Sequence, residues 1–358
     1  PELPENRIQI IYFIGLIFIP VLIWRFTYMR VFFAPKYFKD ILVISHSSKA
    51  TLLLDLISKR GFHNVICYAS DRKSEDYGQF YDINQISVYD LVKSKGAKEV
   101  ILTTRGFSSD VMAKLNKDTI ALFEEGINIK SFESFYEEVT DRVSKEVLDH
   151  NFYKYINLSS TSENKFYQVF RRILDIVISV LGLLIFTSLI PIIFIANLLA
   201  NRGPLFYMQN RVGRKGKEFR IFKLRSMIVN AESQGAQYAI KNDKRITAFG
   251  KFLRNTRLDE VPQFFNILKG DMSLIGPRPE RPEFVKNLQE QIPFYAIRHV
   301  VKPGLTGWAQ VNYPYATNLE EQEKKLRYDL FYIKEQSAYI DFKIIIKTMT
   351  TILFFRGQ

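Results

Sequence analysis

Cysteine, histidine and tryptophan are scarce in this chain, which has one, four and two of them among 358 residues. Cys67 lies in the apolar run Val65–Tyr68 and has no second cysteine to pair with, which excludes a disulfide scaffold and favours folding in a reducing compartment. Nothing near Cys67 supports a role as a nucleophile, so we expect a buried, inert thiol. His46 and His63 lack metal-ligand spacing and are expected to be surface or packing residues.

Acidic residues are outnumbered by basic ones, 37 to 50, which gives a formal net charge of +13. Hydrophobic residues make up 47% of the chain, and this excludes an intrinsically disordered protein. The length predicts two or three structural units. Basic charge combined with long apolar blocks favours a protein that acts on an anionic partner at a membrane.

The first long apolar block, Ile8–Trp24, is interrupted by only one polar side chain, Gln9. Aromatic and cationic residues follow at once, as on the cytoplasmic flank of a membrane helix. They are Trp24, Arg25, Tyr28, Arg30, Lys36 and Lys39. We therefore predict a transmembrane helix and its flank over residues 1–36, with the following chain in the cytoplasm. A buried core helix is the alternative. Because the first residue is proline, we expect the sequence to begin inside a longer protein.

Residues 37–140 alternate between short apolar runs and helical patterns, which predicts a small parallel α/β domain. The predicted strands are Ile41–Ile44, Val65–Tyr68, Val100–Thr103 and Ile127–Ile129. The first strand-to-helix turn has no glycines to admit a pyrophosphate. We therefore interpret this domain as an assembly or regulatory module, with nucleotide binding as the alternative. A homodimer is plausible on the same grounds.

Residues 141–165 are polar and predict a linker, after which the chain enters its longest apolar stretch, Ile173–Ala200. Arg171 and Arg202 stand on either side of it, so positive charge gives no orientation. A re-entrant membrane helix over residues 166–202 keeps both neighbouring domains on one face, whereas a simple span would separate them. The predicted helix break is at Pro191, where Thr187 and Ser188 could satisfy freed carbonyl groups.

From Arg202 onward the chain is dense in cations, as expected of a phosphate-binding surface or a basic face beside anionic lipid. No recognisable nucleic-acid-binding fold accompanies them, so nucleic acid is not expected as a partner. Two adjacent acids, Asp259 and Glu260, precede Pro262 and therefore a predicted helix start. There they could cap the helix or take part in phosphoryl transfer as nucleophile or Mg²⁺ ligand. On chemistry alone the two interpretations are even.

Two later loops add candidate binding residues. Pro277 and Pro279 flank Arg278 and would hold its guanidinium in one direction, which suits bidentate phosphate recognition. The turn-rich loop 301–311 contains Lys302 and Trp308.

Four segments resemble the bacterial sugar transferase family, and within it the monotopic polyprenyl-phosphate phosphoglycosyl transferases. They are FKLRSM (222–227), FLRNTRLDEVPQFFNILKGDMSLIGPRP (252–279), VKPGLTGWAQVN (301–312) and RYDLFYIKEQSAYIDFKII (327–345). The likeness runs from about Phe166 to the C-terminus. The preceding helix and α/β domain resemble the long-form members, which carry extra membrane helices and a Rossmann-like domain. The implied fold class is α/β, with a mixed α/β catalytic domain over residues 203–358.

The resemblance implies transfer of the 1-phosphate of a hexose, with glucose and galactose as the candidates, from a UDP-sugar to undecaprenyl phosphate, with release of UMP. Such a step initiates assembly of exopolysaccharide, capsule or O-antigen. The family's mechanism puts a covalent phosphosugar on Asp259, with Glu260 positioning the nucleophile or Mg²⁺, for which both acids are the candidate ligands. The implied phosphate and nucleotide contacts are Lys223, Arg225, Arg254, Arg278 and Lys302.

The resemblance also implies a location in the bacterial inner membrane, with the catalytic domain facing the cytoplasm. This sequence departs from the family pattern at one place. Many members have Ser-Pro at the break of the re-entrant helix, whereas this chain has Thr187-Ser188 there and Pro191 further on. The rival hypotheses are a non-catalytic membrane-anchored regulator and a protein that only binds anionic lipid or nucleic acid.

Overall fold

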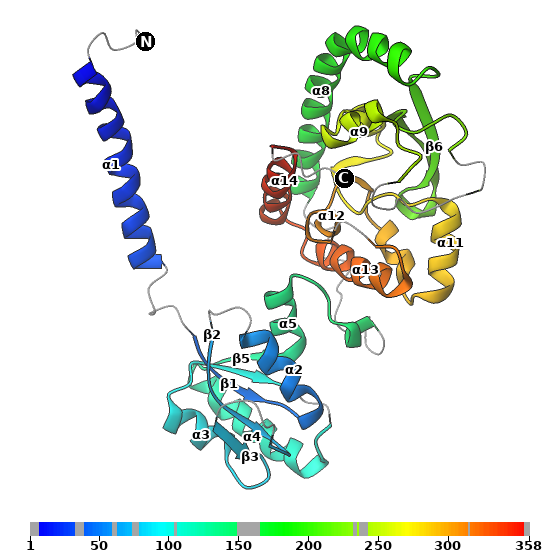
Figure 1. The fold of residues 1–358 in the computed structure, drawn as a ribbon. Coiled ribbons are helices and arrows are strands. Elements are labelled where there is room, and N and C mark those ends of the chain that lie inside the picture. Colours follow the sequence, from blue (N-terminus) through cyan, green and yellow to red (C-terminus); the bar gives the residue numbers. More distant parts are fainter. Residues whose placement is uncertain are drawn as a thin grey trace. The chain divides into compact units, whose positions relative to one another are not determined.

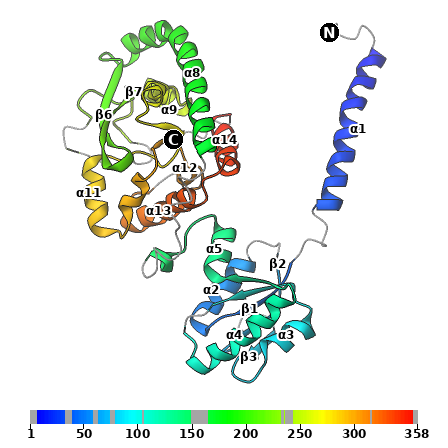
Figure 2. The same ribbon diagram turned by 180° about the vertical axis from the view of Figure 1, so that it is seen from behind.

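The structure is a computed structural model that describes residues 7–32, 39–58, 63–73, 79–103, 106–148, 165–231, 235, 243–313 and 316–353. The chain divides into two compact units, Pro1–Val139 and Thr140–Gln358 (Figures 1 and 2). The first unit contains ten of the described elements. They are α1 (Arg7–Phe32), β1 (Lys39–Ile44), α2 (Ser47–Ser58), β2 (His63–Ser70), β3 (Gln79–Asp82), α3 (Val88–Lys95), β4 (Glu99–Leu102), α4 (Ser109–Glu124), β5 (Asn128–Ser131) and α5 (Phe132–Thr140).

The first apolar block forms α1, a single helix of 26 residues that carries Pro20 inside it. Its described large apolar side chains, from Tyr12 to Trp24, are all exposed. Within the described residues, the apolar segment Gly15–Arg25 is shorter than a membrane span, and Lys165–Ala200 is the one helix long and apolar enough to cross a membrane. The predicted helix is confirmed, and its role as a membrane anchor stays a prediction.

Residues 39–131 form a five-stranded parallel sheet in the order β3-β2-β1-β4-β5. Alternate residues of a strand point to opposite faces, and β1 shows this directly. Leu42 and Ile44 pack in the core with α3 and α4, whereas Ile41 and Val43 pack in the core with α2 and α5. Helices therefore cover both faces, as in doubly wound folds, and the predicted parallel α/β domain is confirmed.

Cys67 lies in the middle of this sheet and is completely buried. Burial raises the pKa of its thiol to about 11, so the thiolate form is disfavoured at neutral pH. This agrees with the inert packing role predicted for it.

The turn between β1 and α2 is occupied by the chain's own side chains. Asp71 accepts hydrogen bonds from the Ser47 backbone N–H at 2.7 Å and from its hydroxyl at 3.1 Å. The His46 ring packs against Gly106, where a Cβ atom would come within 2.8 Å of it. In a dinucleotide-binding domain, the N-terminus of this helix faces a pyrophosphate. Here a carboxylate takes that position, which favours the non-nucleotide interpretation of the domain.

The second unit is built around a long helix, a β-hairpin and a set of shorter helices. Its described elements are α8 (Lys165–Ala200), β6 (Phe206–Val212), η3 (Arg214–Gly216), β7 (Glu218–Leu224), α9 (Ala248–Asn255), η4 (Leu258–Glu260), α10 (Gln263–Lys269), β8 (Ser273–Ile275), α11 (Pro282–Gln291), η5 (Tyr295–His299), β9 (Gly304–Thr306), α12 (Trp308–Asn312), α13 (Leu319–Lys334) and α14 (Ala338–Leu353). Strands β6 and β7 pair antiparallel, and β8 and β9 pair parallel.

The first residues of the predicted linker, 141–165, pack on this second unit. Val143 and Val147 are fully buried in its core together with Leu330 and Tyr332. The Trp308 indole N–H donates to the Asp141 carbonyl at 2.9 Å. Residues 149–164 lie outside the described part of the chain.

Helix α8 stays helical from Lys165 to Ala200 and carries Pro191 inside it. Its axis changes direction strongly along its length, as both ribbon views show (Figures 1 and 2). The Thr187 hydroxyl donates to the Leu183 carbonyl at 2.8 Å and the Ser188 hydroxyl to the Ile185 carbonyl at 2.7 Å. Such side-chain bonds favour helix bending. The break predicted at Thr187, Ser188 and Pro191 is therefore corrected to a continuous helix that bends.

Polar contacts attach both ends of α8 to the second unit. Near its start, Asp175 is buried and accepts from the Ser273 hydroxyl at 3.1 Å and the Leu274 N–H at 2.8 Å. Just beyond its end, the Asn201 side-chain amide donates to the Arg225 carbonyl at 3.2 Å. A straight helix of 36 residues would be about 54 Å long, and the bend of α8 accompanies contacts of both its ends with one unit.

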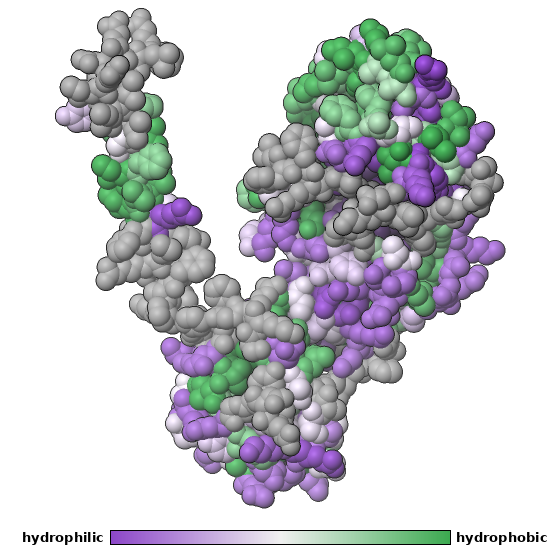
Figure 3. Space-filling model, in the orientation of Figure 1, coloured by the Kyte–Doolittle hydropathy of each residue, from purple (hydrophilic) through white to green (hydrophobic). Residues whose placement is uncertain are grey.

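The outer side of α8 remains apolar and exposed. In Figure 3 the surface over the bent upper part of this helix is largely green. Its exposed apolar side chains include Phe166, Val169, Phe170, Ile173, Val177, Leu181, Leu184, Ile185, Ile192, Phe194, Ile195, Leu198 and Leu199. An apolar face of this size is typical of a surface that contacts lipid or another protein.

Candidate active site

The candidate site lies where β7, α9 and η4 meet beneath the second half of α8. Phe186 and Ile193 of α8 pack in one apolar cluster with Leu224 of β7 and Leu253 of α9. Leu258 and Val261, which flank the two acids, pack against the same cluster. The residues that flank the two acids therefore also attach their turn to α8.

Asp259 and Glu260 sit in the single 3-10 turn η4, directly before Pro262 and α10. Both side chains are buried. Arg257, which precedes the turn, has the left-handed backbone angle φ 60°, a conformation that is unfavourable for a residue with a Cβ and that concentrates at functional sites. The predicted position of both acids just before a helix is confirmed.

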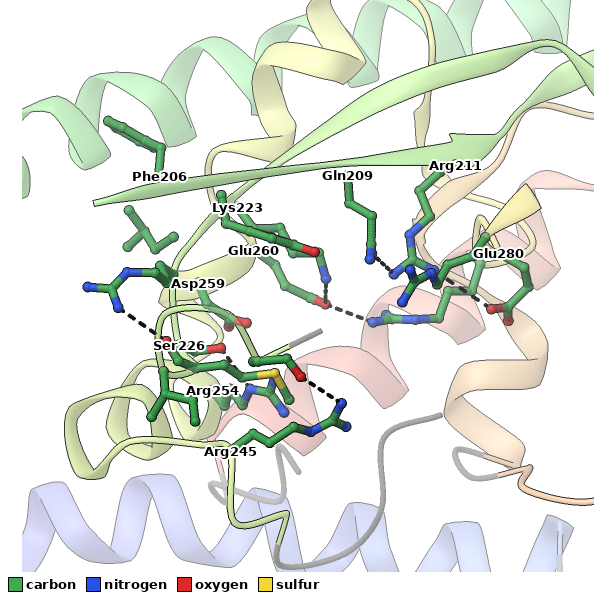
Figure 4. Close-up of a pocket in the computed structure, with 18 of the residues that line it drawn as sticks. Phe206, Gln209, Arg211, Lys223, Ser226, Arg245, Arg254, Asp259, Glu260 and Glu280 are labelled. Atoms are coloured by element: carbon green, nitrogen blue, oxygen red, sulfur yellow. Dashed lines mark hydrogen bonds and ion pairs between the residues drawn. The ribbon is translucent and has the colours of Figure 1, made fainter. Parts of the chain in front are cut away.

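Glu260 is surrounded by cations. Its Oε1 lies 3.3 Å from Lys223 Nζ and 3.2 Å from Arg278 Nη2, and its Oε2 lies 3.5 Å from Arg257 Nη1. Figure 4 shows the first two of these contacts as dashed lines in the middle of the cavity. Burial alone would raise the pKa of Glu260, but Lys223, Arg278 and Arg257 together hold it well below its usual value.

Asp259 has a different environment from its neighbour. Its Oδ1 is buried and has no hydrogen-bond partner among the described residues. Burial, and then the Glu260 carboxylate, raise the pKa of Asp259 to about 6. Lys223, Arg254 and Arg257 act in the opposite direction. The pair therefore consists of one carboxylate that the protein has fully engaged and one that is left available to react.

Arg254 points its guanidinium into the cavity near Asp259 (Figure 4). Its Nε donates to the Ser226 hydroxyl at 2.9 Å, and Ser226 is itself buried. Helix α9 approaches this serine closely, because a Cβ atom on Gly250 would come within 1.9 Å of the Ser226 carbonyl oxygen. Only glycine fits at this contact, which fixes the distance between α9 and the loop after β7.

Arg278 is held by two loops that touch backbone to backbone. A Cβ atom on Gly276 would lie 2.4 Å from the Lys302 carbonyl oxygen, and one on Gly304 would lie 2.1 Å from the Gly276 nitrogen. The Gly276 N–H donates to the Thr306 carbonyl at 2.9 Å. The loop residues 276–279 and 301–307, which carry two of the recognised motifs, therefore form one rigid structure.

Arg225 lines the cavity but already has partners. Its guanidinium donates to the carbonyls of Pro204 at 2.7 Å, Asn201 at 3.2 Å and Met227 at 3.3 Å. These contacts make it a structural residue that joins the end of α8 to the loop after β7. Phosphate binding by Arg225 stays a prediction.

Lys302 and Trp308 lie apart from the residues that line the cavity. A Cβ atom on Gly270 would be 3.6 Å from Lys302 Nζ and 3.8 Å from Arg172 Nη2, so Lys302 lies at the end of α10. Trp308 is buried in the core and stacks on Phe331 at 6.2 Å between ring centroids. Phosphate binding by Lys302 also stays a prediction.

The cavity has a volume of about 680 Å³, which lies in the usual range for small-molecule sites. Lys223, Arg254, Asp259, Glu260 and Arg278 all line it. The structure thus brings six of the seven predicted catalytic and binding side chains, Arg225 included, around one cavity. Sequence reasoning placed Arg211 and Arg257 only among the cations of the basic segment, and gave no role to four other lining residues: Gln209, Ser226, Glu280 and Lys325. The place of Arg257 two residues before Asp259 could have assigned it to the site.

The residues present suit a Mg²⁺ ion held partly by substrate. Mg²⁺ often binds through one or two carboxylates together with phosphate oxygens, and the unpartnered Asp259 Oδ1 could supply one such ligand. Glu260 is less suited, because its two oxygens already face three cations. Among the described residues there is no cluster of three or more His, Cys, Asp or Glu side chains that could hold a metal ion without substrate.

Comparison with known proteins agrees with the resemblance of the motifs. The sequence profile of the family described as "Bacterial sugar transferase" matches residues 166–355. The chain belongs to the bacterial sugar transferase family. The matched region covers α8 and nearly all of the described second unit, and it includes every residue of the candidate site.

Three relatives illustrate the family's range. The UDP-N-acetylgalactosamine-undecaprenyl-phosphate N-acetylgalactosaminephosphotransferase of Aeromonas hydrophila is 43% identical over 217 residues, which are 61% of this chain and 50% of that protein. The UDP-glucose:undecaprenyl-phosphate glucose-1-phosphate transferase of Escherichia coli K12 is 41% identical over 184 residues, or 51% of this chain and 40% of that protein. A putative undecaprenyl-phosphate N-acetylgalactosaminyl 1-phosphate transferase of Bacillus subtilis is 48% identical over 132 residues, or 37% and 74%. The chain spans half or less of the first two relatives' length.

Proposed function

We propose that this protein transfers a sugar-1-phosphate from a UDP-sugar to undecaprenyl phosphate, in two displacements on Asp259. The single observation that carries the proposal is the unequal carboxylate pair. Asp259 has a buried, unpartnered oxygen, whereas its neighbour Glu260 is engaged by three cations. Family membership and the names of the relatives support the reaction class.

In the first displacement, an Asp259 carboxylate oxygen attacks the phosphorus that bears the sugar. The new bond is the Asp259 O–P bond, and the bond that breaks joins this phosphorus to the bridging oxygen, which leaves with UMP. In the second, a phosphate oxygen of undecaprenyl phosphate attacks the same phosphorus and the Asp259 O–P bond breaks. The carboxylate is regenerated and the product is a sugar-diphosphate lipid. Splitting the transfer in this way is a form of covalent catalysis.

The surrounding cations stabilise the charge that moves during both steps. Lys223, Arg254, Arg257 and Arg278 face the two carboxylates and leave an excess of positive charge in the cavity. Buried cations interact strongly with phosphate oxygens because water does not screen them. Asp259 would help to hold Mg²⁺, and the ion would supply further neutralisation of the phosphate charge of the donor. Glu260 keeps Lys223 and Arg278 in position.

The proposal places the second unit on the cytoplasmic face of the bacterial inner membrane, with α8 as a re-entrant helix. Its support is the exposed apolar side of α8 together with the attachment of both helix ends to the same unit. This arrangement brings the water-soluble donor and the lipid phosphate to one cavity.

The decisive test is UMP release by the purified protein in nanodiscs with a panel of UDP-sugars, with and without Mg²⁺ and undecaprenyl phosphate. We expect Asp259→Asn to abolish release, and we expect the wild type, incubated with donor alone, to gain the mass of one phosphosugar. The matched control is Asp271→Asn, because Asp271 is an acid of the same domain that pairs with Lys269 at 2.9 Å outside the cavity. Full activity of Asp259→Asn would reject the proposal and favour a protein that only binds anionic ligands.

A further inference from the structure

The cavity has two chemically different ends, with Lys223 and Glu260 between them (Figure 4). Toward one end lies Phe206, which is apolar and exposed (Figure 4). Toward the other lies a set of polar side chains, here called the polar end. It consists of Gln209, Arg211, Glu280, Gln322 and Lys325.

Strand β6 sets the distance between the reactive centre and the polar end. Tyr207, Gln209 and Arg211 alternate along the strand and all line the cavity. Tyr207 pairs directly with Lys223 across the hairpin. Two residues of a strand span about 7 Å. Along β6, Gln209 therefore lies about the length of one hexose ring beyond Tyr207, which pairs with Lys223. A sugar attached to the attacked phosphorus can therefore reach Gln209.

The polar end presents hydrogen-bond donors and an acceptor close together, which suits hydroxyl groups. Glu280 accepts a hydrogen bond from Lys325 Nζ at 2.7 Å, and its other oxygen lies 3.8 Å from Arg211 Nη1. A hydroxyl group can donate to that carboxylate and accept from the cations at the same time. Among the described residues, Arg211 Nε is buried and has no acceptor.

The polar end is also rigid. Arg211 Nη2 donates to Gln209 Oε1 at 2.6 Å, and Arg211 Nη1 donates to the Pro279 carbonyl at 3.1 Å. Arg298 is buried below Glu280 and donates to Asp329 Oδ2 at 2.8 Å and to the Arg278 carbonyl at 3.0 Å. Groups fixed in this way can distinguish hydroxyl positions, because a misplaced hydroxyl leaves a buried partner unsatisfied.

We infer that the polar end binds the hydroxyl groups of the transferred sugar and selects among donor sugars. This inference rests on the proposed function. It separates two parts of the donor, with the diphosphate at the cation-rich centre and the neutral sugar beside Gln209. The ribose of the nucleotide also carries vicinal hydroxyl groups, so the experiment must distinguish the two.

The test compares wild-type protein with Gln209→Ala in nanodiscs, using UDP-glucose, UDP-galactose, UDP-N-acetylglucosamine and UDP-N-acetylgalactosamine. The readouts are kcat/KM for each donor and the inhibition constant of UMP. We expect the ratio of kcat/KM between the best and the second donor to fall about tenfold, while UMP inhibition stays within about twofold. The matched control is Asn210→Ala. Asn210 follows Gln209 on β6, so its side chain lies on the opposite face of that strand, where it is exposed and bonds Glu218 of β7.

The other outcomes are decisive as well. Equal losses for all four donors with weaker UMP inhibition would assign the polar end to the ribose and overturn the inference, as would an unchanged donor ratio. If Gln209→Ala lowers the unfolding temperature, Gln322→Ala provides the same comparison from α13, where its side chain bonds the Ala316 carbonyl. Failure of the proposed function is distinguishable, because the wild type would then release no UMP from any donor.

Discussion

At the scale of single residues, Asp259 and Glu260 carry the same functional group, and the difference between them comes from their surroundings. Both are buried carboxylates in one short turn. Three cations lie within 3.5 Å of Glu260 and hold its pKa down. Asp259 lacks such close partners among the described residues, so burial dominates and its pKa rises. Neighbouring sites whose pKa values are pushed apart are typical of paired catalytic acids.

The pKa of Asp259 predicts the acid limb of the pH profile. The nucleophile must be ionised, and its pKa is raised to about 6, so kcat/KM for the donor should fall as the pH drops through about 6. Burial lowers the pKa of Lys223 to about 8. Because this lysine must be charged to bind phosphate, kcat/KM should also fall above about pH 8. The measurement is UMP release against pH at low donor concentration, which reports the free enzyme.

The variant Lys223→Arg separates the two limbs. An arginine stays charged at this pH, so the alkaline limb should disappear while the acid limb remains. If the alkaline limb persisted in Lys223→Arg, Lys223 would not be its origin.

Ser226 is expected to act as a positioning residue for Arg254. Removal of its hydroxyl in Ser226→Ala leaves Arg254 Nε without its 2.9 Å acceptor. We expect kcat/KM to fall about tenfold, or about 1.4 kcal/mol, with KM for the donor rising. Thermal unfolding should change little. Thr256→Ala is the control, because its hydroxyl bonds only helix carbonyls outside the cavity. An equal loss in both variants would contradict the positioning role.

At the scale of elements, α8 carries a large exposed apolar surface and also contacts the region around η4, the turn that holds Asp259 and Glu260. Its inner side packs on the strand and helix that carry Lys223 and Arg254, and a Cβ atom on Gly182 would come within 2.4 Å of Phe264 in α10. Its outer side is exposed and apolar. A single helix therefore faces two environments, and its bend keeps the inner side in contact with the domain.

The bent helix predicts the topology of its two ends. Single cysteines placed at Lys165 and Arg202, in a Cys67→Ala background, should react with a membrane-impermeant thiol reagent from the same side of the membrane. The physical reason is that Asp175 near the start of α8 and Asn201 just beyond its end both bond the same folded unit. Labelling is measured in intact cells and in inverted vesicles. Reaction of the two positions from opposite sides would show that α8 crosses the bilayer.

At the scale of the whole molecule, the chain consists of two units with separate cores. The parallel sheet of the first unit is covered on both faces by its own helices. The second unit has its own clusters, and every residue that lines the cavity belongs to it. Stability and activity are therefore expected to separate between the units.

This separation can be tested with Leu53→Ala, which removes a fully buried side chain from the first unit. We expect a loss of about 2–5 kcal/mol in the stability of that unit, seen as a lower first transition in calorimetry. Donor kcat/KM at low temperature should remain unchanged. Leu330→Ala in the second unit is the matched control and should lower both the other transition and the activity. Loss of activity with Leu53→Ala would show that the catalytic unit depends on the first.

The secondary elements of this chain follow from local patterns. Short apolar runs such as Ile41–Ile44, separated by helical patterns, predicted parallel strands, and these strands pair in the structure. The apolar stretch after Arg172 predicted a long helix, and it forms one. These predictions succeed because a strand or helix that is buried on one or both faces spaces its apolar residues along the sequence in a recognisable pattern. The bend of α8 was harder, since the helix stays continuous where the sequence suggested a break.

The site was only partly accessible to prediction. Asp259, Glu260, Lys223, Arg254 and Arg278 were named from motifs, and they do line one cavity. Arg225 and Lys302 were named on the same grounds. The Arg225 guanidinium, however, donates to backbone carbonyls, and the Lys302 side chain lies beside α10. A motif shows that a cation is present, whereas its partners depend on chain segments far away in sequence.

The sequence by itself determined the family, the α/β alternation of the first unit, the long apolar helix and the pair of acids, because these depend on residue types and local spacing. Only the tertiary structure decided which acid is free to react, where the helix bends and which residues form the polar end of the cavity. These properties arise from contacts between distant segments, such as Glu280 with Lys325 and Asp175 with Leu274. Burial and charge at a site are sums over such neighbours, and a linear sequence does not contain the distances that enter those sums.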